Sequence, residues 1–167
     1  VSAAARAGAM APRVRCVLTG RVQVLGHTTS GIAKQPVAGP CRVGPLGFEA
    51  DEQGDLRAHG GEFKAVHCYA WSHYAHWRRL QPAQALFDRP GAFGENLSLE
   101  GLDEDGVCIG DRWRIGSALF TVTEPPCNCA HCCTMVSPRP VPAMLLTFDA
   151  RKKEEKRERK DQTNRWN

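Results

Sequence analysis

The sequence lacks several patterns that would each define a class of protein. No apolar run approaches the length that crosses a bilayer, so we expect no membrane-spanning segment. The chain shows no internal repeat, no alternation of strands with helices and no glycine-rich nucleotide loop, which argues against a Rossmann-type sheet. The N-terminal residues are rich in Ala and lack the apolar core of a secretory signal. We therefore expect a cytoplasmic, reducing compartment and free thiols rather than a disulfide framework.

The body of the chain also lacks a surplus of charge of either sign. The formal net charge is +4, but residues 151–160 hold seven Lys or Arg and three Glu, so residues 1–150 are neutral overall. A neutral body has no basic surface excess for nucleic acid. We therefore expect neither a nucleic-acid partner nor a membrane partner, and we interpret the charged run as a solvated appendage.

Short apolar stretches separated by turn residues dominate what is present. The helix with the clearest signals covers residues 71–80, where Ser72 can cap the start and Pro82 ends the run. A second helical turn is predicted at 84–87. Strands are predicted within 13–25 (two), within the loop 27–47 (one), and at 64–69, 107–109, 112–115 and 118–122. This pattern predicts a mainly β, α+β domain or small barrel.

One segment has the composition of a site rather than of a structural element. Residues 51–61 combine acids, an amide, bases and the Gly60-Gly61 pair, and an apolar strand follows at once. Paired glycines behind a histidine suit a loop that brings backbone close to a charged ligand. Asp51 either belongs to that site or caps a turn. His67, in the apolar strand, is interpreted as a core histidine.

The cysteines fall into two groups. Cys16, Cys41, Cys68 and Cys108 lie among apolar neighbours and are interpreted as small buried hydrophobes. The others are clustered around a histidine: Cys127, Cys129, His131, Cys132 and Cys133. Such soft ligands are typical of a zinc or copper site. However, no second Cys or His cluster exists to complete a two-knuckle site, so a structural zinc site is the weaker alternative.

Several short motifs occur in an order that resembles the MOSC domain, and within it the bacterial 6-N-hydroxylaminopurine resistance proteins. The matching segments are residues 47–53, 59–61, 64–67, 93–97 and 109–111, with Lys34 at the position of an early lysine. Each motif is weak by itself, but the order and spacing are specific. The resemblance covers roughly residues 20 to 129. After Cys129 the family pattern is replaced by closely spaced prolines and then by the charged tail.

The resemblance implies a mainly β (α+β) fold, a MOSC-type, pyruvate-kinase-like β-barrel with one or two short helices. We place this domain at residues 13–133. Residues 1–12 are expected to be disordered. Residues 134–167 are expected to form a divergent, Pro-rich and charged tail that is disordered or helical, because dense proline prevents a central strand. The barrel is then incomplete at its C-terminal end.

The resemblance also implies an activity. Members bind the molybdenum cofactor (molybdopterin) through a cysteine thiolate and reduce small N-hydroxylated substrates to amines. A separate flavoprotein or other reductase supplies the electrons. A second family role, sulfur handling during cofactor maturation, would need a partner domain that binds pyridoxal phosphate, and none is recognised in this sequence. The alternative is a non-catalytic or degenerate module that binds cofactor or, through the cysteine cluster, zinc.

Site residues follow from the same resemblance. Cys129 is expected to ligate the metal, with Cys127 as the alternative if the alignment contains a deletion, and His59 is expected to donate a proton or a hydrogen bond near the metal. The residues expected to hold the cofactor are Lys34, Arg57 and Lys64 at the phosphate, Gly60 and Gly61 beside the pterin, and Glu95 and Asn96 at the pterin nitrogens.

Overall fold

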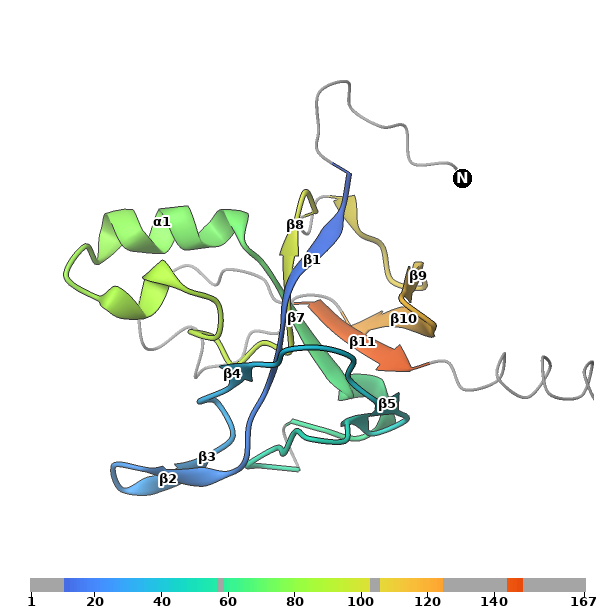
Figure 1. The fold of residues 1–167 in the computed structure, drawn as a ribbon, viewed down its shortest axis with the longest axis horizontal. Coiled ribbons are helices and arrows are strands. Elements are labelled where there is room, and N and C mark those ends of the chain that lie inside the picture. Colours follow the sequence, from blue (N-terminus) through green and yellow to red (C-terminus); the bar gives the residue numbers. More distant parts are fainter. Residues whose placement is uncertain (1–10, 57–58, 103–105, 125–143, 149–167) are drawn as a thin grey trace, which may run out of the picture.

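The computed structural model describes residues 11–56, 59–102, 106–124 and 144–148, and within these the fold is mainly β (Figure 1). One α-helix, α1 (Ser72–Leu80), and two short 3₁₀ helices, η1 (Glu62–Lys64) and η2 (Ala85–Asp88), interrupt the strands. The strands are β1 (Arg13–Thr19), β2 (Gln23–Leu25), β3 (Thr28–Ser30), β4 (Gln35–Pro36), β5 (Val43–Gly44), β6 (Gly47–Phe48), β7 (Val66–Ala70), β8 (Leu97–Glu100), β9 (Arg112–Ile115), β10 (Ala118–Glu124) and β11 (Met144–Phe148).

The largest sheet has seven strands in the order β4-β1-β8-β7-β11-β10-β9. All neighbours are antiparallel except β7 and β8, which run parallel. The hairpins β2–β3 and β5–β6 form separate two-stranded sheets. Within the described part of the chain β4 and β9 each pair on one side only, so the sheet is not closed there into the expected barrel.

Two apolar clusters pack on the two faces of β7. Val66 and Cys68 point into one cluster together with Leu97, Phe120 and Val122. Tyr69 points the other way, as period-two alternation requires, into an aromatic cluster with residues of α1 and η2. The members of this second cluster are Tyr69, Tyr74, Trp77, Phe87 and Phe93. Figure 1 shows α1 on the side of the sheet away from β9 and β10.

The helix and two of the strands agree with the sequence-based prediction, with one difference in detail. Helix α1 ends before Pro82, and the backbone N–H of Gln81 donates to the Trp77 carbonyl. Its N-cap is Trp71 rather than Ser72, without a side-chain capping bond. Trp71 instead donates its N–H to the Leu99 carbonyl of β8, so the sheet satisfies that donor. Strand β9 has the predicted bounds, and β10 extends the predicted one to Glu124.

Other expectations were wrong. Residues 107–109 do not form the predicted strand, and Cys108 is exposed rather than buried. The segment forms a turn instead, in which the Asp111 carboxylate accepts the Cys108 N–H. The segment 27–48 holds four short strands rather than one.

Strand β11 corrects the expectation for the tail. Residues 134–167 were expected to be disordered or helical, yet Met144–Phe148 pairs with both β7 and β10 inside the main sheet. The proline argument does not apply to this strand, because it begins after Pro142 and contains no proline. Among the described residues, no helix is long and apolar enough to cross a membrane.

Candidate functional site

The ends of four strands meet at one end of the main sheet. Thr19 at the end of β1 pairs with Gln35 at the start of β4, and Leu97 at the start of β8 pairs with both Val17 and Cys68. The loops that precede β4, β7 and β8 therefore converge at this end. They carry most of the described residues that the sequence assigned to the site.

A buried carboxylate, Asp51, joins these loops. It forms an ion pair with Lys34, and their side chains are 1% and 6% exposed. Its Oδ1 also accepts the Gly20 N–H at 2.9 Å, and its Oδ2 accepts the Asn96 amide at 2.8 Å. All these partners are distant in sequence, so Asp51 does not merely cap a local turn.

The side chain of Asn96 belongs to the same hydrogen-bond network. Its amide donates to the Leu18 carbonyl at 3.2 Å as well as to Asp51, and its Oδ1 accepts the His67 N–H at 3.1 Å. Both N–H donors of the amide are thereby used. Because Asn96 is 3% exposed, it holds β1, β7 and the Asp51 loop together from inside the protein.

Burial has an electrostatic consequence for Lys34. Burial lowers the pKa of its ammonium, whereas the hydrogen bond and charge of Asp51 act to raise it. A buried ion pair is strongly destabilised by the loss of one partner, because the other charge is left uncompensated. The ion pair therefore fixes the loops only while both partners are ionised.

Glu95 points to the opposite side, toward helix α1. It is fully buried, accepts the Tyr74 hydroxyl and the Gly91 N–H on Oε1, and accepts the Phe93 N–H on Oε2 at 3.2 Å. The Tyr74 oxygen in turn accepts the N–H groups of Gly91 and Ala92. Burial and the charge of Glu95 both raise the pKa of the Tyr74 phenol. These bonds fix the loop 91–94 that precedes Asn96.

His67 lies beside this network rather than in an apolar core. Its ring hydrogen-bonds the Gly94 backbone and is within electrostatic range of Lys34, Asp51 and His59, while part of the residue stays exposed. Burial of the ring lowers its pKa from 6.5 to about 4, and the positive charges of Lys34 and His59 add to this shift. The imidazole is therefore neutral at physiological pH.

The predicted ligand loop lies at the surface above these residues. His59 is exposed, and its N–H donates to the Asp55 carbonyl at 2.7 Å. Gly60 and Gly61 have φ angles of 119° and 78°, a region that favours glycine. A Cβ at Gly61 would meet no atom within 4 Å, so the backbone there is open to a ligand. Lys64, half-buried, ends the 3₁₀ turn that follows.

The structure thus brings Lys34, Glu95 and Asn96 to one buried core, with His59, Gly60, Gly61 and Lys64 in a surface loop near it. Arg57, Cys127 and Cys129 lie outside the described residues. No group of three His, Cys, Asp or Glu side chains within the described residues is arranged to hold a metal ion.

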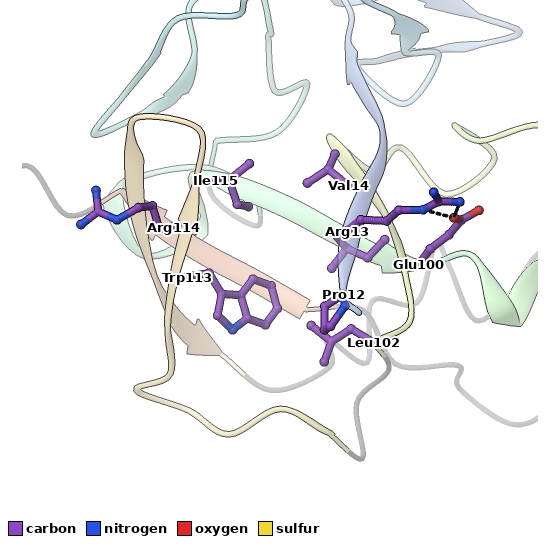
Figure 2. A pocket seen from close by; sticks show the side chains of 9 residues that line it. Pro12, Arg13, Val14, Glu100, Leu102, Trp113, Arg114 and Ile115 are labelled. Atoms are coloured by element: carbon purple, nitrogen blue, oxygen red, sulfur yellow. Dashed lines mark hydrogen bonds and ion pairs between the residues drawn. The ribbon is translucent and has the colours of Figure 1, made fainter. Parts of the chain in front are cut away.

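A separate cavity of about 470 Å³ lies at the far end of β1 and β8 (Figure 2). Its apolar wall includes Val14, Leu99, Trp113 and Ile115. Figure 2 shows the Arg13–Glu100 ion pair extending away from the Trp113 ring. None of the residues expected to bind the cofactor lines this cavity.

Comparison with known proteins identifies the class. The family model of the MOSC domain matches residues 55–159, well over half of the chain. The chain therefore belongs to the MOSC domain family. The match continues past Cys129, so the expectation that the family pattern ends there was wrong.

Within this family the chain is similar to YiiM. It is 44% identical over 115 residues to Protein YiiM of Escherichia coli (strain K12), covering 68% of this chain and 51% of that protein. It is 39% identical over 105 residues to a Gibberella moniliformis protein named Reductase, covering 61% of this chain and 18% of that protein. The chain thus spans about half the length of YiiM and much less of the fungal protein.

Solved structures support the fold. The structure of YiiM from Geobacillus stearothermophilus aligns with a TM-score of 0.60 at 27% identity, covering 83% of this chain and 68% of that one. The Escherichia coli YiiM structure aligns with a TM-score of 0.54 at 29% identity, covering 80% and 60%. The mainly β architecture of the described residues is therefore that of the MOSC fold.

Sequence reasoning missed three residues of this region: Asp51 as its centre, Tyr74 as the partner of Glu95, and His67. A signal for His67 was present, because period-two alternation places it opposite Val66 and Cys68, with Tyr69. No comparable local signal exists for the Tyr74–Glu95 pair, which joins a helix to a loop 21 residues away.

Replacing Asp51 by Asn should lower the free energy of unfolding by about 3–5 kcal/mol, because Lys34 is left buried without its counter-charge. Chemical denaturation followed by circular dichroism measures this. The neighbouring Glu52→Gln change is the matched control: Glu52 pairs with Arg21 at the exposed surface, so its loss should be far smaller. Equal losses for the two variants would contradict a structural centre at Asp51.

The lowered pKa of His67 predicts acid sensitivity. In the unfolded chain the imidazole takes up a proton near pH 6.5, whereas in the folded protein it does so only near pH 4. Stability should therefore fall as pH decreases from about 6.5 to about 4, because the unfolded state binds more protons in that window. Denaturation midpoints of His67→Gln across this range should show a shallower fall than wild type. Parallel curves would show that His67 is not responsible.

Proposed function

We propose that this chain binds the molybdenum cofactor and reduces N-hydroxylated bases, or related N-oxygenated compounds, to amines. The observation that carries the proposal is membership of the MOSC family together with 39% identity to a protein named Reductase. MOSC domains are associated with the C-terminal domains of molybdenum cofactor sulfurases, which links the family to this cofactor.

The described residues fit the phosphate end of such a cofactor. The N–H groups of Gly60 and Gly61 have no acceptor among the hydrogen bonds of the described residues, and a Cβ at Gly61 would point into open space. Exposed backbone N–H groups beside cationic side chains favour a phosphate dianion. In the proposal Gly60, Gly61 and Lys64 hold the phosphate, and Arg57 adds a second cation.

Burial changes the roles that we propose for the other residues. Lys34, Glu95 and Asn96 are committed to Asp51, Tyr74 and the backbone. We therefore assign them to positioning: Asn96 and Lys34 fix the Asp51 loop, and Glu95 fixes the loop 91–94. In this assignment, direct contact with the cofactor falls to the surface loop that carries Gly60 and Gly61.

The reaction makes defined demands on the protein. Reducing an N-hydroxylated base breaks the N–O bond, takes up an electron pair and a pair of protons, and releases water. When bound, the molybdenum cofactor supplies the electron pair, which a separate flavoprotein or other reductase replenishes. In the proposal, His59, which is exposed beside the glycine pair, donates a proton to the leaving oxygen.

The thiolate ligand is proposed to be Cys129, with Cys127 as its alternative. Both follow Glu124, which ends β10, and Glu124 is aligned with His67 through Leu145 of β11. Two strand spacings place Glu124 about 10 Å from His67 across the sheet. The cysteine segment therefore starts from the part of the sheet that carries the site.

Metal and pterin analysis of the purified protein tests this function. We expect molybdenum and pterin in wild type and at least about tenfold less molybdenum in Cys129→Ala, because a thiolate ligand is lost. Cys127→Ala is the matched control and should keep its metal. Equal molybdenum in all three proteins would exclude Cys129 as the ligand. Zinc alone, or no metal in wild type, would favour the non-catalytic alternative.

A further inference from the structure

His67 occupies the position in the sheet that connects the two halves of the site. On one side its backbone N–H and carbonyl bond Asn96, which belongs to the Asp51 network. On the other side it pairs with Leu145 of β11, which pairs with Glu124 at the end of β10. One row across the sheet therefore runs from the buried ion pair, through His67, to the strand end from which the cysteine segment continues.

Within the described residues, the His67 ring has one hydrogen-bond partner, the Gly94 backbone. A neutral imidazole has one N–H donor and one acceptor nitrogen. The hydrogen bond to the Gly94 backbone acts to raise the pKa, as expected of a ring N–H that donates to a carbonyl. No donor to the second nitrogen is found among the described residues. The residue also keeps part of its surface exposed.

A structural histidine would not show this combination. A core histidine is expected to have both nitrogens bonded and no exposed surface. The Lys34 ammonium lies nearby, but its recorded partner is Asp51 and not the His67 ring. The second ring nitrogen, for which the described residues offer no donor, and the partial exposure of His67 together point to a group that binds from outside.

We propose that His67 is a ligand-contacting residue whose neutral imidazole accepts a hydrogen bond from an N–H or O–H group of the bound substrate. Because Gly94 orients the ring, and burial together with the positive charge of Lys34 keeps it neutral, the residue selects donors and cannot itself offer a second proton. The hydroxylamine of an N-hydroxylated base carries both kinds of donor. This assignment rests on the proposed function and adds to it the residue that recognises the N–OH group.

Chemical modification tests whether the nitrogen is accessible. Diethylpyrocarbonate reacts with the unprotonated nitrogen of an accessible imidazole, and mass spectrometry maps the product on the full chain. We expect modification of His67 as well as of His27, which is exposed on the β2–β3 hairpin and serves as the reference. An N-hydroxylated purine should protect His67 and leave His27 reactive. Modification of His27 without any at His67 would overturn the proposal.

Binding to matched variants tests recognition. Calorimetric titration of wild type with an N-hydroxylated purine should give an affinity about tenfold higher than that of His67→Phe, the effect of one neutral hydrogen bond. His67→Gln, which keeps an acceptor, should recover part of the loss, and His27→Phe should match wild type. Thermal unfolding of each variant establishes that it is folded.

The outcomes separate this proposal from the proposed function. Purine binding that is unchanged in a folded His67→Phe overturns the role of His67 and leaves the reductase function standing. Failure of wild type to bind the purine, together with absence of molybdenum and pterin, overturns the function and with it this substrate contact. A loss confined to His67→Phe, with protection of His67 by the purine, supports both.

Discussion

The buried ion pair between Lys34 and Asp51 is the constraint on which the rest of the site depends. A carboxylate that is 1% exposed can remain charged only if every oxygen is compensated, and Asp51 obtains this from Lys34, the Gly20 N–H and the Asn96 amide. Each partner belongs to a different segment of the chain. Satisfying one charge therefore fixes three segments relative to one another, and the surface loop that carries the glycine pair follows directly from Asp51 in sequence.

A second buried carboxylate extends this arrangement to the helix. Glu95 lies next to Asn96 in the chain, but Glu95 bonds Tyr74 of the helix whereas Asn96 bonds Asp51. The two neighbouring residues therefore connect this segment to two different parts of the molecule. The loop between Gly91 and Gly94 is thereby held at both ends, and Gly94 in turn orients His67. Positioning of the His67 ring thus depends on polar bonds rather than on apolar packing, which agrees with its partial exposure.

Local patterns predicted the parts of the fold that depend on local causes. Helix α1 and strand β9 have clear periodicity and turn signals, and both were predicted with nearly the observed bounds. Strand β11 could not be predicted in this way, because it forms between two distant strands and follows a proline-rich stretch. The motif residues Asp51, Glu95 and Asn96 stood out in the sequence, but which of them pairs with which depends on contacts up to 78 residues apart. That these side chains bond one another and the backbone, rather than facing a ligand, could be seen only in three dimensions.

If Asp51 fixes the backbone of the site, amide hydrogen exchange in Asp51→Asn should reveal it. The Gly20 N–H donates to the Asp51 carboxylate, and the His67 N–H donates to Asn96 Oδ1. The Val122 N–H donates to the Asp111 carbonyl elsewhere in the fold and serves as the reference. Exchange at Gly20 and His67 should accelerate relative to Val122 in the variant, because an Asn side chain offers one neutral acceptor oxygen where the Asp51 carboxylate accepts from Lys34, Gly20 and Asn96. Unchanged ratios in a folded variant would contradict it.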